Sequence, residues 1–408
     1  MIKVGKATAG LLLLAVGGAL LADRLMDTNL LGYAADWWPL VFILLGLEYI
    51  WVNFKYGGRE RTRLEIGGVA AAVLVCAAIV AYSQGRLAPA KWLDGFDWQF
   101  GSVLSGEFGH KFEKEPITVR VTGKTDKLVV DNPNGGVVLK AGDGDRITIE
   151  TTVWVDKLDE DKSRQVADAS KVEVAEGETL RVSALGETYS GRRKPRMNMV
   201  VTVPAAVPLD IELQLRNGRV EADNVPIRDE LVVRTTNGSV SVNGLDGNLI
   251  ADTTNGSIRA SGIGGMADLG TTNGAVTVAD VSGDAFARTT NASVRMERIR
   301  GKAEAETQNG AIGIEEAERG VRAKTTNGAV TVASHTVGGD WKAETTNGRI
   351  ELKLPSQGHY TVEGEGGKAS SDLPLNVSER SIQGRVGTGQ YEIRLETTNG
   401  SLVVNRID

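Results

Sequence analysis

The chain has 408 residues, a formal net charge of −6, 50 glycines and only 5% aromatic residues. The modest negative charge argues against a nucleic-acid partner, and the single cysteine, Cys76, excludes an internal disulfide. Abundant glycine with few aromatic residues is typical of narrow coils with many corners rather than of one large core.

Three apolar runs near the amino terminus are at or just under the length that spans a bilayer: residues 7–22, 37–54 and 66–82. A signal peptide is the alternative for the first run, because Lys3 and Lys6 precede a leucine-rich core. Two further apolar runs favour an uncleaved anchor, so we expect a three-span transmembrane anchor over residues 1–83.

Basic residues predict the orientation of this anchor. Six Lys and Arg residues flank it on the side of the amino terminus and the 55–65 loop, against three on the other side. We therefore expect a multi-pass protein of the cell membrane whose carboxy-terminal domain is extracytoplasmic. Glu48, an ionisable residue within the second run, has two interpretations: local pairing near the interface with Lys55, or a functional role.

Residues 84–115 mix glycine, aromatic and charged side chains and are expected to form a stalk or linker. Residues 116–215 contain segments of alternating apolar residues, which predict an irregular, β-rich amino-terminal part of a larger β-structure. The polar segment 159–171 lacks glycine and proline and predicts one surface helix.

The sequence Thr-Thr-Asn-Gly recurs through residues 216–354, and its asparagines, counted from Asn217, follow one another in steps of 18 or 20 residues. A fixed period of this size indicates a solenoid. Apolar residues alternate with polar ones before and after each copy, which predicts two strands per coil. A third apolar position, as at Leu245 and Ile263, suggests roughly three inward-facing sides. The predicted fold is an all-β, single-stranded parallel β-helix with coils of ~18 residues.

In such a coil each residue lies about 4.8 Å from its counterpart one repeat away. The repeated asparagines are therefore predicted to form one hydrogen-bonded ladder: Asn237, Asn255, Asn273, Asn291, Asn309, Asn327 and Asn347. The repeated threonines are predicted to form a buried column beside it: Thr235, Thr253, Thr271, Thr289, Thr307, Thr325 and Thr345. Because Ala292 replaces the glycine in one copy, we expect the asparagine to be the residue with positive φ at this corner.

The outward column just before the threonines predicts opposite charges stacked on one another: Arg234, Asp252, Gly270, Arg288, Glu306, Lys324 and Glu344. After Asn347 the period breaks for 52 residues before Asn399. Residues 355–408 are therefore expected to form atypical terminal coils and a cap, because an open solenoid end would leave unpaired strand edges.

The carboxy-terminal two thirds resemble the bacterial putative-adhesin family of β-strand-repeat envelope proteins, through MVVTVPAAVPLDIELQLRNGRVEADNV, the TTNG copies and GQYEIRLETTNGSLVV. The opening GLLLLAVGGALLADRL and WWPLVFILLGL are similar to the transmembrane hairpin of LiaF-type envelope-stress proteins. Glu48 and the third apolar run depart from that hairpin pattern. The resemblance implies a membrane-anchored envelope protein.

No catalytic motif is found in the sequence: the three histidines are not at metal-ligand spacing, and a P-loop, a dinucleotide fingerprint and Gly-x-Ser-x-Gly do not occur. We expect no enzymatic activity, no cofactor and no metal. A polysaccharide lyase or glycosidase is the enzymatic alternative, because β-helices can present carboxylates on an outer face. The acids without a stacked basic neighbour, Asp268, Asp280 and Asp284, are interpreted as isolated surface positions.

Three non-catalytic functions stay open. The chain is a surface-binding module or scaffold of the cell envelope (a putative adhesin), an extracytoplasmic sensor or regulator in envelope-stress signalling, or a self-associating coil. The expected partners are the membrane and either an envelope protein or a polysaccharide.

Overall fold

The computed structural model describes residues 2–4, 62–64, 109–121 and 124–407. The three apolar runs, Glu48 and most of the expected stalk lie outside these residues. The chain divides into two compact units, Met1–Glu107 and Phe108–Asp408. In the first unit, β1 (Ile2–Val4) pairs in parallel with β2 (Thr62–Leu64). Within the described ranges, no helix has the length and apolarity to cross a membrane.

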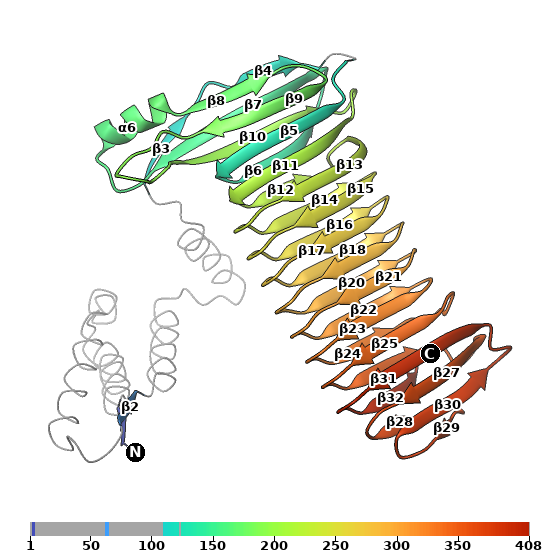
Figure 1. The fold of residues 1–408 in the computed structure, drawn as a ribbon. Coiled ribbons are helices and arrows are strands. Elements are labelled where there is room, and N and C mark those ends of the chain that lie inside the picture. Colours follow the sequence, from blue (N-terminus) through green and yellow to red (C-terminus); the bar gives the residue numbers. More distant parts are fainter. Residues whose placement is uncertain (1, 5–61, 65–108, 122–123, 408) are drawn as a thin grey trace, which may run out of the picture. The chain divides into compact units, whose positions relative to one another are not determined.

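The second unit is a stack of coils built from two sheets of 15 strands each (Figure 1). We call them sheet I and sheet II. In spatial order, sheet I contains β28 (Ala369–Ser371), β32 (Leu402–Arg406), β26 (Ile350–Leu354), β24 (Val330–Ala333), β22 (Ile312–Ala317), β20 (Val294–Ile299), β18 (Val276–Val281), β16 (Ile258–Ile263), β14 (Val240–Leu245), β12 (Val220–Asp223), β6 (Val137–Gly142), β10 (Arg196–Pro204), β7 (Arg146–Val155) and β3 (His110–Glu113), with β4 (Ile117–Arg120) also on β7.

Sheet II contains, in spatial order, β29 (Asn376–Val377), β30 (Ser381–Val386), β27 (Tyr360–Glu365), β31 (Tyr391–Thr397), β25 (Trp341–Thr345), β23 (Val321–Thr325), β21 (Ala303–Glu306), β19 (Ala285–Arg288), β17 (Ala267–Gly270), β15 (Asn248–Asp252), β13 (Ile227–Arg234), β11 (Leu209–Asn217), β5 (Lys127–Asn134), β9 (Thr179–Leu185) and β8 (Lys171–Ala175). Each regular coil contributes one strand to each sheet, and neighbouring coils pair in parallel. This is the predicted parallel β-solenoid.

The register follows the apolar alternation of the sequence. Ile258 pairs with Val276 and then Val276 with Val294 in sheet I, while Ala267 pairs with Ala285 in sheet II, and all of these side chains are buried. Because strand side chains alternate between faces, every second residue of each strand enters the narrow space between the sheets. The many inward alanines of sheet II fit this narrow space.

The coils have two sides, not the three that the sequence suggested. In β14, β16, β18, β20 and β22 the third apolar position is the last residue of the sheet I strand: Leu245 pairs with Ile263, and Ile263 with Val281. These side chains are buried at the far end of the same core. They extend sheet I around the corner and do not build a third sheet.

The prediction of a left-handed asparagine is wrong, because none of the ladder asparagines has a positive φ. In the regular coils the residues with positive φ lie at the opposite corner and form a column of their own: Asn224, Gly244, Gly262, Asp280, Arg298 and Glu316. At the Thr-Thr-Asn-Gly corner, glycine is needed for close approach instead. A Cβ on Gly274 would lie 1.8 Å from the carbonyl oxygen of Gly256 in the adjacent coil.

Both ends of the stack depart from the regular coil. At the amino-terminal end β7 runs antiparallel to β10, β3 and β4, so the part of the expected stalk from His110 to Glu113 belongs to sheet I. Helix α6 (Glu160–Ala169) packs against β3 and β7, and the carboxylate of its N-cap Asp159 accepts a hydrogen bond from the Lys162 amide. This local bond satisfies one of the free amides at the helix start.

At the carboxy-terminal end the closing regular copy is not the outermost layer. Strands β31 and β32 stack directly on β25 and β26. The irregular strands β27 and β28 then stack on the far side of β31 and β32, and β30 adds antiparallel to β27. The short strands β28 and β29 end the two sheets, which leaves little exposed strand edge.

Candidate functional site

The predicted ladder residues are brought together in one column. Each asparagine Nδ2 donates to the Oδ1 of the asparagine one coil earlier, at 2.7 to 3.0 Å: Asn237 to Asn217, Asn255 to Asn237, Asn273 to Asn255, Asn291 to Asn273, Asn309 to Asn291, Asn327 to Asn309, Asn347 to Asn327 and Asn399 to Asn347. The last bond spans the 52-residue step and adds Asn399, which the predicted ladder omitted although its TTNG copy indicates it. The ladder side chains are exposed to solvent.

The threonine column lies beside the ladder. In each coil the Thr Oγ1 donates to a main-chain oxygen of the preceding coil's corner, for example Thr253 to Gly238, Thr271 to Gly256 and Thr325 to Gly310, each at 2.9 Å. The equivalent bonds are made by Thr235, Thr289, Thr307, Thr345 and Thr397. All of these threonines are less than 10% exposed. We call the two columns together the Asn–Thr seam.

The outward charges of sheet II are in the predicted register but form different ion pairs. Arg288 pairs in the sheet with Glu306, yet its guanidinium binds Asp268 at 2.6 Å. Arg234 pairs with Asp252 and binds Glu212 at 3.0 Å instead. Each guanidinium therefore binds an acid other than the residue stacked directly on its arginine. Alignment of the repeats predicts the stacked neighbours but not these ion pairs.

Two of the acids interpreted as isolated have basic partners. Asp268 is bound by Arg288, and Asp280 receives two hydrogen bonds from Arg298 at 2.6 and 2.9 Å. The Arg298 hydrogen bonds hold the pKa of Asp280 below its usual value. Asp252 differs, because partial burial and then the neighbouring Asp268 raise the pKa of its carboxyl group.

A second polar ladder crosses the outer face of sheet I. Asn243 Nδ2 donates to Asp223 Oδ1, and Ser261 Oγ donates to Asn243 Oδ1, both at 2.8 Å. Asp223, Asn243, Ser241 and the neighbouring Lys140 line a groove of about 540 Å³. The sequence analysis missed this ladder, although aligning the second strands of successive coils would have placed the three residues in one column.

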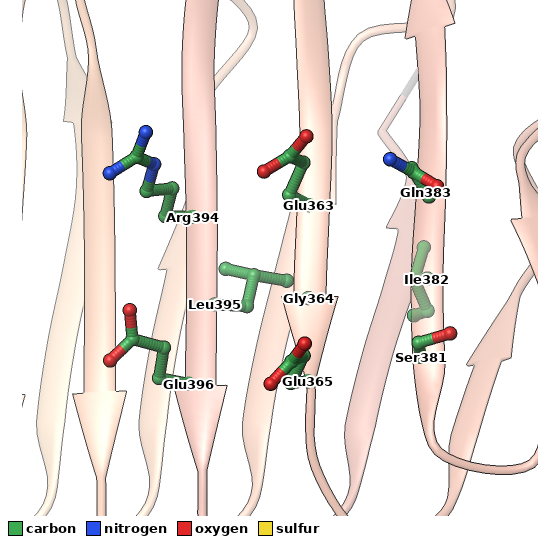
Figure 2. Close-up of a pocket in the computed structure, with 9 residues that line it drawn as sticks. All are labelled: Glu363, Gly364, Glu365, Ser381, Ile382, Gln383, Arg394, Leu395 and Glu396. Atoms are coloured by element: carbon green, nitrogen blue, oxygen red, sulfur yellow. The ribbon is translucent and has the colours of Figure 1, made fainter.

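A groove with a volume of about 440 Å³ and three glutamates in its lining lies at the carboxy-terminal end of sheet II. Figure 2 shows two rows of side chains across β31, β27 and β30: Arg394, Glu363 and Gln383 in one, and Glu396, Glu365 and Ser381 in the other. The sheet register sets both rows, because Glu363 lies opposite Arg394 and Gln383, and Glu365 lies opposite Glu396 and Ser381. We call this the terminal groove.

Charge in the terminal groove is not balanced internally. Arg394 is bound by Glu392 at 2.6 Å, and Lys342 reaches Glu396 only at 3.9 Å. The hydrogen bond that Arg394 donates to Glu392 raises the pKa of Arg394. Glu363 and Glu365 make no ion pair with any described residue. The groove therefore presents carboxylate oxygens that can accept hydrogen bonds from a partner or attract its cationic groups.

The described residues contain no group of three or more His, Cys, Asp and Glu side chains that could hold a metal ion. His335 Nδ1 lies 2.6 Å from Glu316 Oε1 at the left-handed corner, where both side chains are exposed to solvent. This pair joins adjacent coils at the surface.

Comparison with known families assigns most of the chain. Residues 125–405 match the family model described as Toastrack DUF4097, and residues 7–50 match the LiaI-LiaF-like transmembrane region. The second match indicates a membrane-anchored chain. A search of curated proteins returned no match.

Among solved structures, the chain is similar to a "putative adhesin" from Parabacteroides distasonis ATCC 8503, with 13% identity over 73% of this chain and 98% of that one and a TM-score of 0.35. A "putative cell adhesion protein" from Clostridium sporogenes ATCC 15579 has 13% identity over 73% and 100%, with a TM-score of 0.24. A "putative lipid binding protein" from Parabacteroides distasonis ATCC 8503 has 12% identity over 72% and 97%, with a TM-score of 0.30. The family match, rather than these low scores, identifies the fold.

Proposed function

Because the chain belongs to the Toastrack DUF4097 family, we propose that it is a non-enzymatic, membrane-anchored β-solenoid that acts as a binding module or scaffold on the extracytoplasmic side of the cell envelope. The match of residues 7–50 to a transmembrane region supports the anchoring. The asymmetry of basic residues around the apolar runs supports the orientation.

The terminal groove is the observation that carries the binding function. Glu363, Glu365 and Glu396 outnumber the one arginine of the groove, Arg394, whose guanidinium is bound by Glu392. Their carboxylate acceptors lie beside the neutral polar groups of Ser381 and Gln383. Such a set of groups fits hydroxyl or amine donors, as found on a polar polymer or on a basic protein surface. The rows of polar side chains along the coils allow further weak contacts, and repetition of weak contacts raises overall avidity.

The acids of the coils support a non-catalytic role. Glycoside hydrolysis needs two carboxyl groups with distinct roles on either side of the scissile bond. Asp268 and Asp280 are instead each held by an arginine. Full-length protein should therefore leave cell-wall glycans and acidic polysaccharides chemically unchanged. Depolymerisation that is abolished by Asp268→Asn or Asp280→Asn would overturn this part of the proposal.

A pull-down of the full-length protein from membranes tests the binding function. The variant Glu363→Gln/Glu365→Gln/Glu396→Gln keeps the size of the side chains and removes their charge, so we expect it to lose the captured partner. Glu306→Gln on β21 is the matched control, since it removes an exposed charge of the same sheet away from the groove, and it should retain the partner. Equal capture by the triple variant and the wild type would refute the terminal groove as the site.

The second candidate is an extracytoplasmic sensor or regulator in envelope-stress signalling, which the match to a LiaI-LiaF-like transmembrane region favours. Replacing residues 1–83 by an unrelated anchor separates the two functions. A sensor should lose its signal in an envelope-stress reporter assay, whereas a binding module should still capture its partner. A self-associating scaffold should sediment from detergent at low protein concentration.

A further inference from the structure

The loop between β9 and β10, residues 186–195, carries three consecutive basic residues: Arg192, Arg193 and Lys194. We call it the basic loop. It lies at the amino-terminal end of the coil stack, on the side where the polypeptide enters the second unit.

The conformation of the basic loop is fixed by several contacts. The main chains of Tyr189 and Arg193 exchange two hydrogen bonds of 2.9 and 3.0 Å around a turn whose tip, Ser190 and Gly191, has positive φ. The Tyr189 hydroxyl donates to the carboxylate of Asp156, and Arg193 Nη1 donates to the same carboxylate at 2.8 Å. Tyr189 is buried. The loop is therefore a preorganised projection rather than a flexible tail.

After Asp156 has neutralised one arginine, the surface of the basic loop still carries positive charge. Asp156 neutralises Arg193, and the hydrogen bond from Tyr189 keeps the pKa of Asp156 low. Arg192 and Lys194 are exposed and make no ion pair with any residue that the structure describes. Lys157 is also exposed, and Glu187 is the acidic residue of the loop. The neighbouring Leu185, at 46% exposure, is one of three exposed large apolar side chains among the residues that the structure describes.

The sheet register places the basic loop next to the point of chain entry. Trp154 of β7 pairs with Arg196, which follows the loop, and on its other side with Lys111, the second residue of β3. His110, the first residue of β3, pairs with Val155, directly before Asp156. The loop and the entering chain thus meet at one end of β7. Since the transmembrane match precedes β3 in the sequence, this is the end of the second unit closest along the chain to the anchor.

We propose that the basic loop is a contact surface for an anionic phospholipid bilayer, with Arg192 and Lys194 binding headgroup phosphates and Leu185 entering the interface. Anionic membrane surfaces attract basic residues, and an apolar side chain beside them can insert into the bilayer interface. The contact holds the amino-terminal end of the solenoid against the membrane. It rests on the membrane anchoring alone and is independent of any ligand at the terminal groove.

The test uses full-length protein with Cys76→Ala and Thr188→Cys, labelled with a fluorophore at the exposed residue 188 and reconstituted in nanodiscs with headgroup spin-labelled lipid. We expect stronger quenching in discs that contain phosphatidylglycerol than in phosphatidylcholine discs, and weaker quenching as the salt concentration rises. In Arg192→Gln/Lys194→Gln protein the loop–membrane contact equilibrium should fall about fivefold for each charge removed.

Two controls separate docking from simple tethering. A label at Thr272→Cys, the exposed residue between Thr271 and Asn273 of the Asn–Thr seam, should show no dependence on lipid charge. Lys353→Gln on β26 removes an exposed cation of sheet I and should leave the quenching of the residue 188 label unchanged. Equal quenching in the two kinds of disc, or an unaltered signal in the loop variant with a wild-type circular dichroism spectrum, would overturn the proposal. Capture of a partner by the terminal groove is measured separately, so failure of one result does not decide the other.

Discussion

Replacing one asparagine of the ladder should weaken the coil stack by an amount that depends on its position. Asn273→Ala removes two ladder bonds, the one donated to Asn255 at 2.7 Å and the one accepted from Asn291 at 2.8 Å. A side-chain hydrogen bond contributes about 0.5 to 1.5 kcal/mol net of water. Because the ladder is exposed, the lower half of this range applies, so we expect a loss of about 1 to 2 kcal/mol in the local opening free energy. Asn217→Ala removes a single bond and should cost about half as much.

Native-state hydrogen exchange is the suitable assay, with the amides of residues 253–291 as the readout. Each coil contacts only its neighbours, and long repeat arrays depart from two-state unfolding, so a global melting temperature would average the effect over the whole stack. Local opening free energies report the affected coils directly.

A double-mutant cycle gives the decisive comparison. Asn255→Ala and Asn273→Ala share one bond, so the double variant loses three bonds rather than four and should be sub-additive by about 0.5 to 1 kcal/mol. Asn237→Ala and Asn291→Ala share none and should add. Strict additivity in both pairs would show that the ladder bonds contribute nothing to stability.

Thr271→Val removes the buried hydroxyl that bonds the Gly256 oxygen and should cost about 1 to 3 kcal/mol in the local opening free energy measured by hydrogen exchange, whereas Thr271→Ser keeps the hydroxyl and should cost less. Gly256→Ala forces a Cβ to 1.8 Å from the main-chain oxygen of Gly238 and should cost about 1 to 3 kcal/mol in the same assay. Asp280→Asn tolerates the positive φ of this position but loses the charge paired with Arg298. The folded-state pKa of Asp280 is lowered, so its contribution to stability is present above the unfolded-state pKa and is lost as the pH falls through the folded-state pKa. The variant should therefore be less stable than wild type by about 0.2 to 1 kcal/mol at neutral pH and equal to it in acid; a difference that persists in acid would contradict the ion-pair explanation.

The repeat and the register of the coils could be predicted from the sequence because identical residues stack on one another. Alternation identified both strands of each coil, and the common phase of the Thr-Thr-Asn-Gly copies located the seam. The left-handed corner could not be found in this way, because Asp280, Arg298 and Glu316 take the place that Gly244 and Gly262 hold in earlier coils. No single residue type marks that column, and long side chains seldom adopt positive φ.

The candidate site was less accessible to sequence reasoning. The partner of Arg288 depends on side-chain conformation, since both Glu306 and Asp268 are within reach of its position in the sheet. The terminal groove requires the order of the last strands in space. The closing repeat around Asn399 stacks on Asn347, which a period can indicate, but the placement of β27 outside β31 cannot be derived from a segment that does not repeat.

The two corners of the coil differ in how they accept additional chain. From each ladder asparagine to the first buried residue of the next sheet I strand the spacing is constant, as from Asn309 to Ile312 and from Asn327 to Val330. Both 20-residue steps and the 52-residue step instead place their extra residues after the sheet I strand, on the side of the coil away from the seam. The first 20-residue step has them at a register shift within β13, the second between Ala333 and Trp341, and the 52-residue step between β26 and β31.

Because extra residues are accepted at one corner only, the surface of the solenoid can change while its register is preserved. A loop, a hairpin or a whole recognition module inserted at the left-handed corner leaves every ladder bond in place, so new surfaces can be acquired without a change of register. Insertion at the seam would instead break the stack. The left-handed corner is therefore the position of the coil that accepts insertions. Both natural divergence and protein engineering should add sequence there.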